Sequence, residues 1–270
     1  MTQHSPPKPR VLILKEHGTN CEKESKFAFE LAGAQAEIIH MNDLIQDAQK
    51  LFDYQILMFP GGFSYGDDTG SGLAWANRIR NNFWEELSRY VEDDHLILGV
   101  CNGFQVLTHL GLVPATEKYG MQEVALSNNE HPRYLDTWVD LVVENRTPWL
   151  KGIHTLMLPI RHGEGRFYAD PKTLATINDR GQVTLRYVEG PYASLTGELA
   201  NPNGSLESIA GITDPTKRIL GMMPHPEAAI DFLHLPNAGR LKRMYQNVGR
   251  EVPTEGPGLQ IIRNGVEYFL

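Results

Sequence analysis

Apolar and polar positions alternate in blocks through residues 1–112 of this chain. Short apolar runs, typical of strands buried on both faces, are separated by segments with the spacing of amphipathic helices. The apolar runs lie at 11–14, 36–40, 55–59 and 95–100. The helical segments lie at 20–33, 44–52, about 73–91 and 102–110. This alternation predicts an α/β fold with a parallel sheet and helices on both of its faces.

After residue 115 the pattern changes to short β-rich runs separated by loops rich in Gly, Pro and Asn. These runs lie at 137–143, 156–158, 183–188 and 219–223. The turn-rich stretch 190–205 is expected to be an exposed loop. An amphipathic helix at 259–269 has an apolar face to cover, and packing back on the sheet is one way to do so. We predict a single three-layer domain of residues 1–270 with a mostly parallel central sheet, β-rich additions, a core at about 10–230 and a C-terminal helical extension at about 231–270.

The composition is that of an ordinary globular protein and disfavours several classes of function. Apolar residues make up 41% of the chain, and 25 Lys and Arg against 33 Asp and Glu leave a net charge of −8. An acidic chain disfavours nonspecific binding to nucleic acid. Residues 1–10 lack the apolar run of a signal peptide, and the sequence has no apolar stretch of membrane-spanning length. We therefore expect a soluble cytoplasmic protein without a membrane partner.

Two cysteines, Cys21 and Cys101, lie eighty residues apart, a spacing that fits neither a disulfide framework nor a zinc site. Cys101 follows a predicted strand and opens a predicted helix in the sequence Gly-Val-Cys-Asn-Gly. A nucleophile at such a turn is lifted out of the sheet, and the flanking glycines relieve crowding between strand and helix. The helix N-terminus stabilises a thiolate. The alternative is a buried structural cysteine at an ordinary strand–helix junction.

A candidate base for this thiol lies in the sequence Met-Met-Pro-His-Pro-Glu, which contains His225 and Glu227. A predicted strand runs into this segment, and its prolines favour an extended backbone, so residues two apart point the same way. His225 can then face Cys101 while Glu227 orients the imidazole ring. The alternative is an exposed histidine followed by a glutamate that caps a helix.

Acyl transfer also needs hydrogen-bond donors for the oxyanion. The predicted strand 55–59 runs into Pro-Gly-Gly-Phe-Ser, whose glycines Gly61 and Gly62 can present backbone N–H groups to a ligand. We predict the N–H groups of Gly62 and Asn102 as the oxyanion donors and Gly61 as a substrate contact. The turn follows the carboxyl end of a parallel strand, where open α/β sheets bind ligands. A plain Gly-Gly turn is the alternative.

Four motifs stand in the order seen in class I, triad-type glutamine amidotransferases. They are PGGFSYGD at 60–67, GVCNGFQ at 99–105, PIRHGEG at 159–165 and GMMPHPE at 221–227. The chain resembles most closely the glutaminase subunits of phosphoribosylformylglycinamidine synthases. The resemblance implies a flavodoxin-like fold and a Cys101–His225–Glu227 triad that hydrolyses L-glutamine through a γ-glutamyl thioester. It also implies that Gln105 helps to hold the substrate, although a plain polar helix residue fits the position equally well.

The resemblance further implies partners, because the released ammonia serves a second active site. No Walker-type phosphate loop occurs in the sequence. We therefore expect no cofactor in this chain, and ATP and Mg²⁺ are used by a synthetase large subunit. In this family that subunit converts formylglycinamide ribonucleotide to formylglycinamidine ribonucleotide in de novo purine biosynthesis, often with a small bridging subunit. The chain departs from the family pattern at Ala228, where relatives commonly carry arginine, at Arg161, and in its long segment after Ile230.

Three other groups of residues carry further predictions. Cys21 is interpreted as structural, because Lys23 stands where an elbow glycine is needed and no further His-x-Glu remains to pair with it. Asp67 and Asp68 are interpreted as a loop carboxylate pair, and no metal site is predicted. A charged Gly-rich loop either lies near the synthetase partner, as the resemblance implies, or is a solvated turn. Its charged residues are His162, Glu164 and Arg166.

Three other hypotheses about function remain open. The first is a stand-alone cysteine hydrolase of γ-glutamyl or peptide bonds, and the second is the glutaminase subunit of a different amidotransferase. The third is a non-catalytic binding subunit that keeps the fold and has lost the chemistry.

Overall fold

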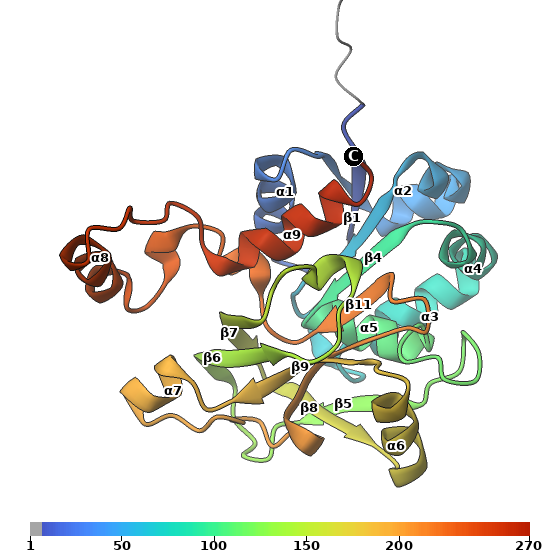
Figure 1. The fold of residues 1–270 in the computed structure, drawn as a ribbon. Coiled ribbons are helices and arrows are strands. Elements are labelled where there is room, and N and C mark those ends of the chain that lie inside the picture. The colour runs from blue at the N-terminus through green and yellow to red at the C-terminus, as the bar shows by residue number, and fades with distance from the viewer. Residues whose placement is uncertain (1–6) are drawn as a thin grey trace, which may run out of the picture.

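The structure is a computed structural model that describes residues 7–270. The expectation that the chain has no signal peptide rests on residues 1–10, most of which lie outside the described part. Within that part, a central sheet has nine strands in the order β2-β1-β3-β4-β11-β10-β9-β6-β7, and β5 and β8 form a small second sheet (Figure 1). The strands are β1 Arg10–Lys15, β2 Gln35–His40, β3 Ile56–Phe59, β4 Leu96–Val100, β5 Val124–Asn128, β6 Leu135–Val143, β7 Thr155–His162, β8 Glu164–Ala169, β9 Val183–Val188, β10 Ile209–Thr213 and β11 Ile219–Met222.

The central sheet has a parallel half and an antiparallel half. The pairs β2–β1, β1–β3, β3–β4 and β4–β11 are parallel, in an order that starts like that of flavodoxin-like folds. From β11 onward every pair is antiparallel. The predicted α/β fold with β-rich additions is therefore confirmed. The strand that joins the two halves, β11, is the one that runs toward His225.

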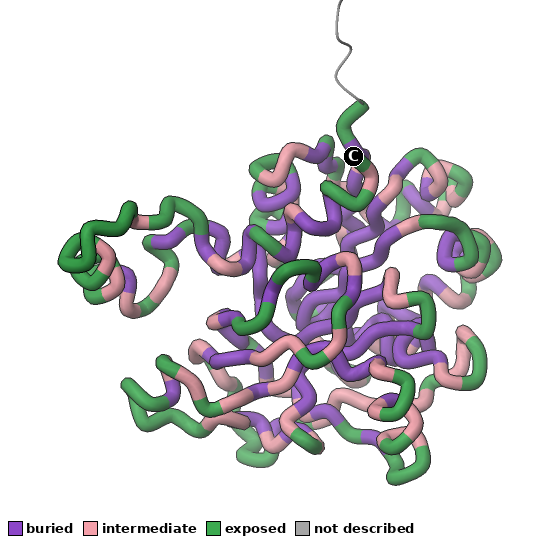
Figure 2. Tube along the Cα trace, in the orientation of Figure 1, coloured by how far each residue is buried: buried purple, intermediate pink, exposed green. Residues whose placement is uncertain are grey.

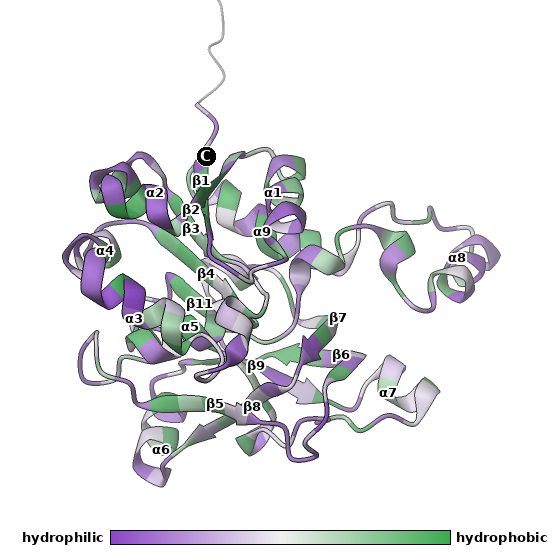
Figure 3. Ribbon diagram, turned by 180° about the vertical axis from the view of Figure 1, so that it is seen from behind, coloured by the Kyte–Doolittle hydropathy of each residue, from purple (hydrophilic) through white to green (hydrophobic). Residues whose placement is uncertain are grey.

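Helices cover both faces of the sheet. On one face α1 (Glu22–Leu31) contacts β1 and β2 and lies beside α9 (Pro257–Glu267). On the other face α5 (Asn102–Leu110) packs against β3, β4 and β11 and contacts α3 (Leu73–Asn82) (Figures 1 and 3). The remaining α-helices are α2 Met41–Gln46, α4 Trp84–Glu92, α6 Pro171–Asp179, α7 Pro191–Thr196 and α8 Ala238–Asn247.

The core lies between these layers. Strands β3 and β4 are buried along their whole length, which is why the sequence shows them as continuous apolar runs rather than as alternating ones (Figure 2). The apolar colouring of these strands against the polar outer faces of the helices is visible in Figure 3. Burial of this kind is the largest favourable contribution to folding.

Several predicted boundaries are wrong. The helix predicted at 73–91 is two helices, because the backbone leaves helical geometry at Phe83, whose ring is buried. The segment predicted at 44–52 is α2 followed by a 3₁₀ turn, Ala48–Asp53. The stretch 190–205 is not an exposed loop throughout: it contains α7, and Asn203 is fully buried. Sequence patterns missed β5, β8, β10, α6 and α8.

The C-terminal extension has two parts. Helix α9 packs against α1 and β7 with Leu259, Ile262 and Val266 buried, as its apolar face predicts. Helix α8 lies on a lobe that projects from the body of the protein, and most of its residues are exposed (Figures 1 and 2). Among residues 7–270, no helix combines the length and the apolar character needed to cross a membrane.

Candidate active site

Cys101 sits at a strained turn between β4 and α5. Its backbone has φ 51° and ψ −108°, outside the regions that L-residues normally occupy. A Cβ atom on Gly103 would lie 1.9 Å from the Phe59 carbonyl oxygen, and one on Gly99 would lie 2.5 Å from Leu107 Cδ1. The sequence-based reason for the two flanking glycines is confirmed, because strand and helix approach too closely here for any side chain.

His225 and Glu227 form a buried pair three to five residues after β11. His225 Nδ1 lies 2.5 Å from Glu227 Oε1, and both side chains are almost completely buried. The backbone N–H of His225 donates to the Pro159 carbonyl oxygen at 2.8 Å, and this hydrogen bond fixes the backbone at His225. Strands β4 and β11 are parallel neighbours with Met222 opposite Val100. Their carboxyl ends therefore bring His225 to the same edge of the sheet as Cys101.

The thiol and the imidazole face one pocket of about 370 Å³. Cys101 Sγ lies 3.5 Å from the Arg161 carbonyl oxygen, and His225 Nε2 is buried without a hydrogen-bond partner in the described structure. Burial alone lowers the pKa of His225, but the charges of Glu227 and then Cys101 outweigh it and raise this pKa well above 6.5. A raised pKa favours the protonated ring, and an imidazolium beside a sulfur atom is the arrangement that activates cysteine nucleophiles.

The predicted oxyanion donors lie on two loops that are tied together. Gly62 has φ 154°, and a Cβ atom there would lie 2.6 Å from Thr19 Cα. The backbone bonds that pair this loop with residues 18–20 are Asn20 N–H to Gly61 O and Phe63 N–H to Gly18 O, so the pairing does not use the Gly62 N–H. Asn102 is the first residue of α5, where backbone N–H groups have no partner within the helix. Both predicted donors are therefore available.

Gln105, predicted as a substrate contact, is not among the residues that line the pocket. The side chain is buried, donates to the Glu164 carbonyl oxygen at 2.6 Å and accepts a hydrogen bond from Asn102 Nδ2 at 2.9 Å. Asn102 Oδ1 in turn accepts the Ser64 N–H at 3.2 Å. Gln105 thus links the start of β8 to the elbow and, through Asn102, to the loop of the predicted oxyanion donor.

Cys21 lies in the same pocket, beside the His225–Glu227 pair that also faces Cys101, and its interpretation as structural stays a prediction. Its sulfur, a ring nitrogen of His225 and a carboxylate oxygen of Glu227 lie within 4.8 Å of one another. Burial raises the pKa of Cys21 above its usual value, although hydrogen bonding to His225 opposes this shift. The pairing of residues 18–21 with residues 61–63 brings Cys21 here, and no sequence periodicity reports such loop-to-loop pairing.

The charged Gly-rich loop is not a solvated turn at His162. This side chain is buried, and its Nδ1 lies 3.0 Å from Asn129 Oδ1. Burial, together with the nearby charge of His225, lowers the pKa of His162 to about 3, so the ring is neutral. Glu164 opens β8 and accepts the Ser71 N–H at 3.3 Å. Arg166 lies within β8, opposite Ser127 of β5.

The two positions that depart from the family pattern line the pocket. Arg161 and Ala228 are both in its wall. The carbonyl oxygen of Arg161 contacts Cys101 Sγ, and its guanidinium lies 3.4 Å from the Asp136 carboxylate.

Asp67 belongs to a second, smaller cavity of about 320 Å³ that shares Phe63 and Tyr134 with the first. Burial raises the pKa of Asp67 to about 6, a hydrogen bond from Ser71 opposes the shift, and the charges of Glu164 and Asp68 add to it. The interpretation of Asp67 and Asp68 as a loop carboxylate pair stays a prediction.

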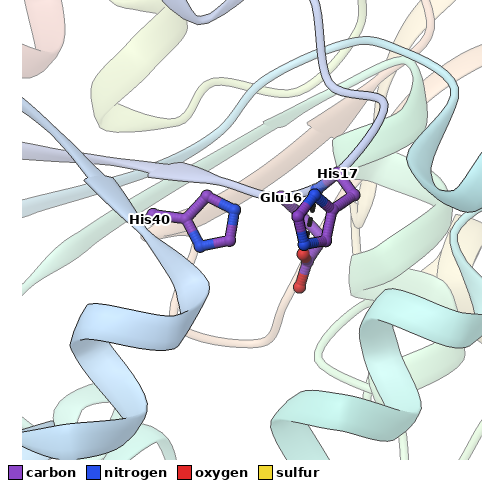
Figure 4. A group of neighbouring side chains, drawn as sticks. All are labelled: Glu16, His17 and His40. Atoms are coloured by element: carbon purple, nitrogen blue, oxygen red, sulfur yellow. Dashed lines mark hydrogen bonds between the residues drawn. The ribbon is translucent and has the colours of Figure 1, made fainter.

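A separate group of potential metal ligands consists of Glu16, His17 and His40 (Figure 4). Glu16 is fully buried and forms an ion pair with Arg78, at 2.8 Å. His40 Nδ1 accepts the Asn42 N–H, which leaves the ring proton on Nε2 in the neutral imidazole. A carboxylate already neutralised by arginine and a ring nitrogen that carries a proton form a poor donor set for a metal ion.

Comparison with known proteins defines the class of this protein. The family model described as a CobB/CobQ-like glutamine amidotransferase domain matches residues 8–269. The fold agrees, since a glutamine amidotransferase of Thermotoga maritima superposes with a TM-score of 0.54 at 12% identity, covering 97% of this chain and 98% of that chain. Nearly the whole chain is therefore a glutamine amidotransferase domain.

Closer relatives define the family within this class. Phosphoribosylformylglycinamidine synthase subunit PurQ of Methanococcus maripaludis is 45% identical over 97% of both chains, and that of Dehalococcoides mccartyi is 37% identical over 97% of this chain and 98% of the relative. A chain in the structure of PurLQS from Thermotoga maritima matches with a TM-score of 0.70 and 28% identity, covering 97% of this chain and all of that one. The protein belongs to the PurQ family.

Proposed function

We propose that this chain is the glutaminase subunit of a phosphoribosylformylglycinamidine synthase and hydrolyses L-glutamine to L-glutamate and ammonia. The observation that carries the proposal is the strained placement of Cys101 beside the buried His225–Glu227 pair in one pocket, in a chain of the PurQ family. A stand-alone hydrolase and a non-catalytic subunit have no such specific support.

In the first half of the reaction Cys101 is the nucleophile. Its thiolate attacks the side-chain amide carbon of glutamine, and a carbon–sulfur bond forms. The N–H groups of Gly62 and Asn102 stabilise the negative charge that develops on the amide oxygen. The imidazolium of His225 then gives its Nε2 proton to the amide nitrogen, the carbon–nitrogen bond breaks, and ammonia leaves the γ-glutamyl thioester behind.

In the second half His225 acts as a base. The neutral ring takes a proton from a water molecule whose oxygen attacks the thioester carbon. The carbon–sulfur bond breaks, glutamate leaves, and the thiolate–imidazolium pair is restored. Glu227 does not itself take the proton; it keeps Nδ1–H in place and stabilises the imidazolium, in accordance with the raised pKa of His225.

Substrate binding involves Gly61 and Gln105 in different ways. A Cβ atom on Gly61 would lie 2.7 Å from His225 Cε1, so the glycine leaves room for the ring behind the pocket lining and acts on the substrate through the position of His225. Gln105 orders the elbow and the start of β8 through Asn102 and the Glu164 carbonyl. We therefore assign Gln105 to glutamine binding through the shape of the site.

The ammonia passes to a partner. In open water ammonia is mostly protonated and loses its nucleophilicity, so the pocket has to be covered by the chain that consumes it. That chain is a synthetase large subunit that uses ATP and Mg²⁺ to convert formylglycinamide ribonucleotide to the amidine, with a small third subunit, in the reducing cytoplasm. The glutaminase works as one domain of residues 1–270, since the nucleophile and the base come from opposite halves of the chain.

The test is glutamate release from glutamine by this chain, with and without its synthetase partner. We expect turnover that depends on the partner and falls at least about a thousandfold in Cys101→Ala, the order of loss typical of a missing nucleophile. Thr147→Ala, a substitution remote from the pocket, is the control. Full turnover by Cys101→Ala would overturn the proposal.

A further inference from the structure

A second thiol lies beside the His225–Glu227 pair. Cys21 precedes α1 and lines the same pocket as Cys101. Its sulfur, a ring nitrogen of His225 and a carboxylate oxygen of Glu227 are mutually within 4.8 Å. The reaction described above assigns no task to this thiol.

The position of Cys21 is fixed by the backbone on both sides. Its N–H donates to the Gly61 carbonyl oxygen at 3.2 Å. Its own carbonyl oxygen accepts the Ser25 N–H at 3.0 Å and the Ser25 hydroxyl at 2.8 Å. The backbone of Cys21 is therefore held between the loop that contains Gly61 and Gly62 and the first turn of α1.

Gly61 shows how closely the thiol and the ring approach. A Cβ atom built on this glycine would lie 3.2 Å from Cys21 Sγ, 2.7 Å from His225 Cε1 and 3.4 Å from His225 Nδ1. The sulfur and the Cε1–Nδ1 edge of the imidazole thus meet over one glycine, on the edge of the ring that faces Glu227. Nε2 is the next ring atom after Cε1, and Nδ1 is the nitrogen that faces Glu227.

The His225–Glu227 pair has two polar atoms that the hydrogen bond between the two side chains does not satisfy. Within residues 7–270, Glu227 Oε2 and His225 Nε2 are both buried without a partner. In the proposed reaction His225 Nε2 transfers protons beside Cys101, whereas Glu227 Oε2 has neither a role nor a hydrogen-bond donor among the described residues. A neutral S–H group is a weak donor that a nearby carboxylate can accept. The thiol of Cys21 donates to Asn20 Oδ1 at 3.3 Å and is the neighbouring donor that can turn toward the pair.

We propose that Cys21 is a positioning residue: its thiol holds the Cε1–Nδ1 edge of His225 against Glu227, so that Nε2 stays directed at Cys101. The proposal rests on the function proposed above for Cys101 and His225. Because burial raises the pKa of Cys21, the thiol stays protonated at neutral pH and does not compete with Cys101 for the imidazolium proton. Cys21 acts through His225 and does not touch the reacting carbon.

The experiment compares Cys21→Ala, which removes the donor, with Cys21→Ser, which keeps one. Lys23→Ala is the matched control, because Lys23 lies two residues after Cys21 in the first turn of α1 and is exposed. In the complex with the synthetase we expect kcat for glutamate release to fall about tenfold in Cys21→Ala with KM changed less than twofold, and Cys21→Ser to recover most of the loss. Melting temperatures of the variants check that each is folded.

A second readout separates this proposal from the proposed function. The rate at which iodoacetamide alkylates Cys101 at pH 6.5, read on the Cys101 peptide by mass spectrometry, reports the thiolate–imidazolium pair without glutamine. We expect this rate to fall several-fold in Cys21→Ala and to be near the wild-type rate in Cys21→Ser and Lys23→Ala. Absence of glutamate release from every protein would contradict the proposed function, while the alkylation series would still test Cys21. Equal alkylation rates in Cys21→Ala and the wild type would overturn the positioning role.

Discussion

The ion pair between Glu16 and Arg78 connects the end of β1 to α3. Glu16 is completely buried, and Arg78 donates to its Oε2 at 2.8 Å and to the Tyr65 hydroxyl at the same distance. In Arg78→Ala the buried carboxylate loses its cation and is left with neutral donors, the His17 N–H and the Tyr65 hydroxyl. Removing one partner of a buried pair costs 3–5 kcal/mol. We expect about 3 kcal/mol, because Arg78 is 30% exposed and water can reach part of the gap.

The measurement is the free energy of unfolding in urea. Arg263→Ala is the control, since Arg263 binds Glu255 at 2.8 and 2.6 Å, yet that carboxylate is 51% exposed. An exposed pair of this kind contributes less than about 1 kcal/mol. The double variant Glu16→Gln/Arg78→Met is expected to be more stable than Arg78→Ala, because it removes the unpaired charge. Equal losses in Arg78→Ala and Arg263→Ala would refute the reasoning that burial sets the cost.

Three further predictions concern the elbow and the two histidines. Gly103→Ala places a Cβ atom 1.9 Å from a carbonyl oxygen of β3 and is expected to cost at least about 3 kcal/mol, whereas Gly239→Ala, in the open part of α8, leaves the melting temperature unchanged or raises it. Glu227→Gln removes the charge that raises the pKa of His225, so in an ¹⁵N-histidine NMR titration this ring loses its proton at a lower pH than in the wild type; an unchanged midpoint would contradict the assignment. His162, whose pKa is lowered to about 3 from 6.5, stabilises the fold above pH 6.5, and this contribution is lost as the pH falls toward 3; between pH 7 and pH 5 the free energy of unfolding should therefore decrease less in His162→Gln than in the wild type.

The parallel half of the fold was predictable because its inner strands β3, β4 and β11 are buried on both faces. Strands β3 and β4 contain no polar residue, so each is visible in the sequence as a continuous apolar run. The elbow at Cys101 was predictable for a different reason: glycines at 99 and 103 are needed wherever a strand and a helix approach this closely. His225 and Glu227 pair as predicted, but the predicted reason is wrong: only His225 is extended, and Glu227 lies in a 3₁₀ turn, Pro226–Ala228, that brings its carboxylate back to the ring.

What escaped prediction depends on contacts between segments far apart in the sequence. The break at Phe83 between α3 and α4 comes from the burial of one ring. The buried state of His162 depends on Asn129 and Asn203, 33 and 41 residues away. Cys21 reaches the pocket through backbone pairing with the Gly61 loop, and polar loops carry no hydrophobic period that could report it.

The central claim is that Cys101, and not the neighbouring Cys21, carries the acyl group during turnover. The most direct test is to quench the protein in its synthetase complex during steady-state turnover of glutamine and to map the γ-glutamyl group by mass spectrometry. The account predicts the group on the Cys101 peptide, no modification on the Cys21 peptide, and loss of the adduct in Cys101→Ala. A γ-glutamyl group on Cys21, or undiminished turnover without any adduct on Cys101, would contradict it.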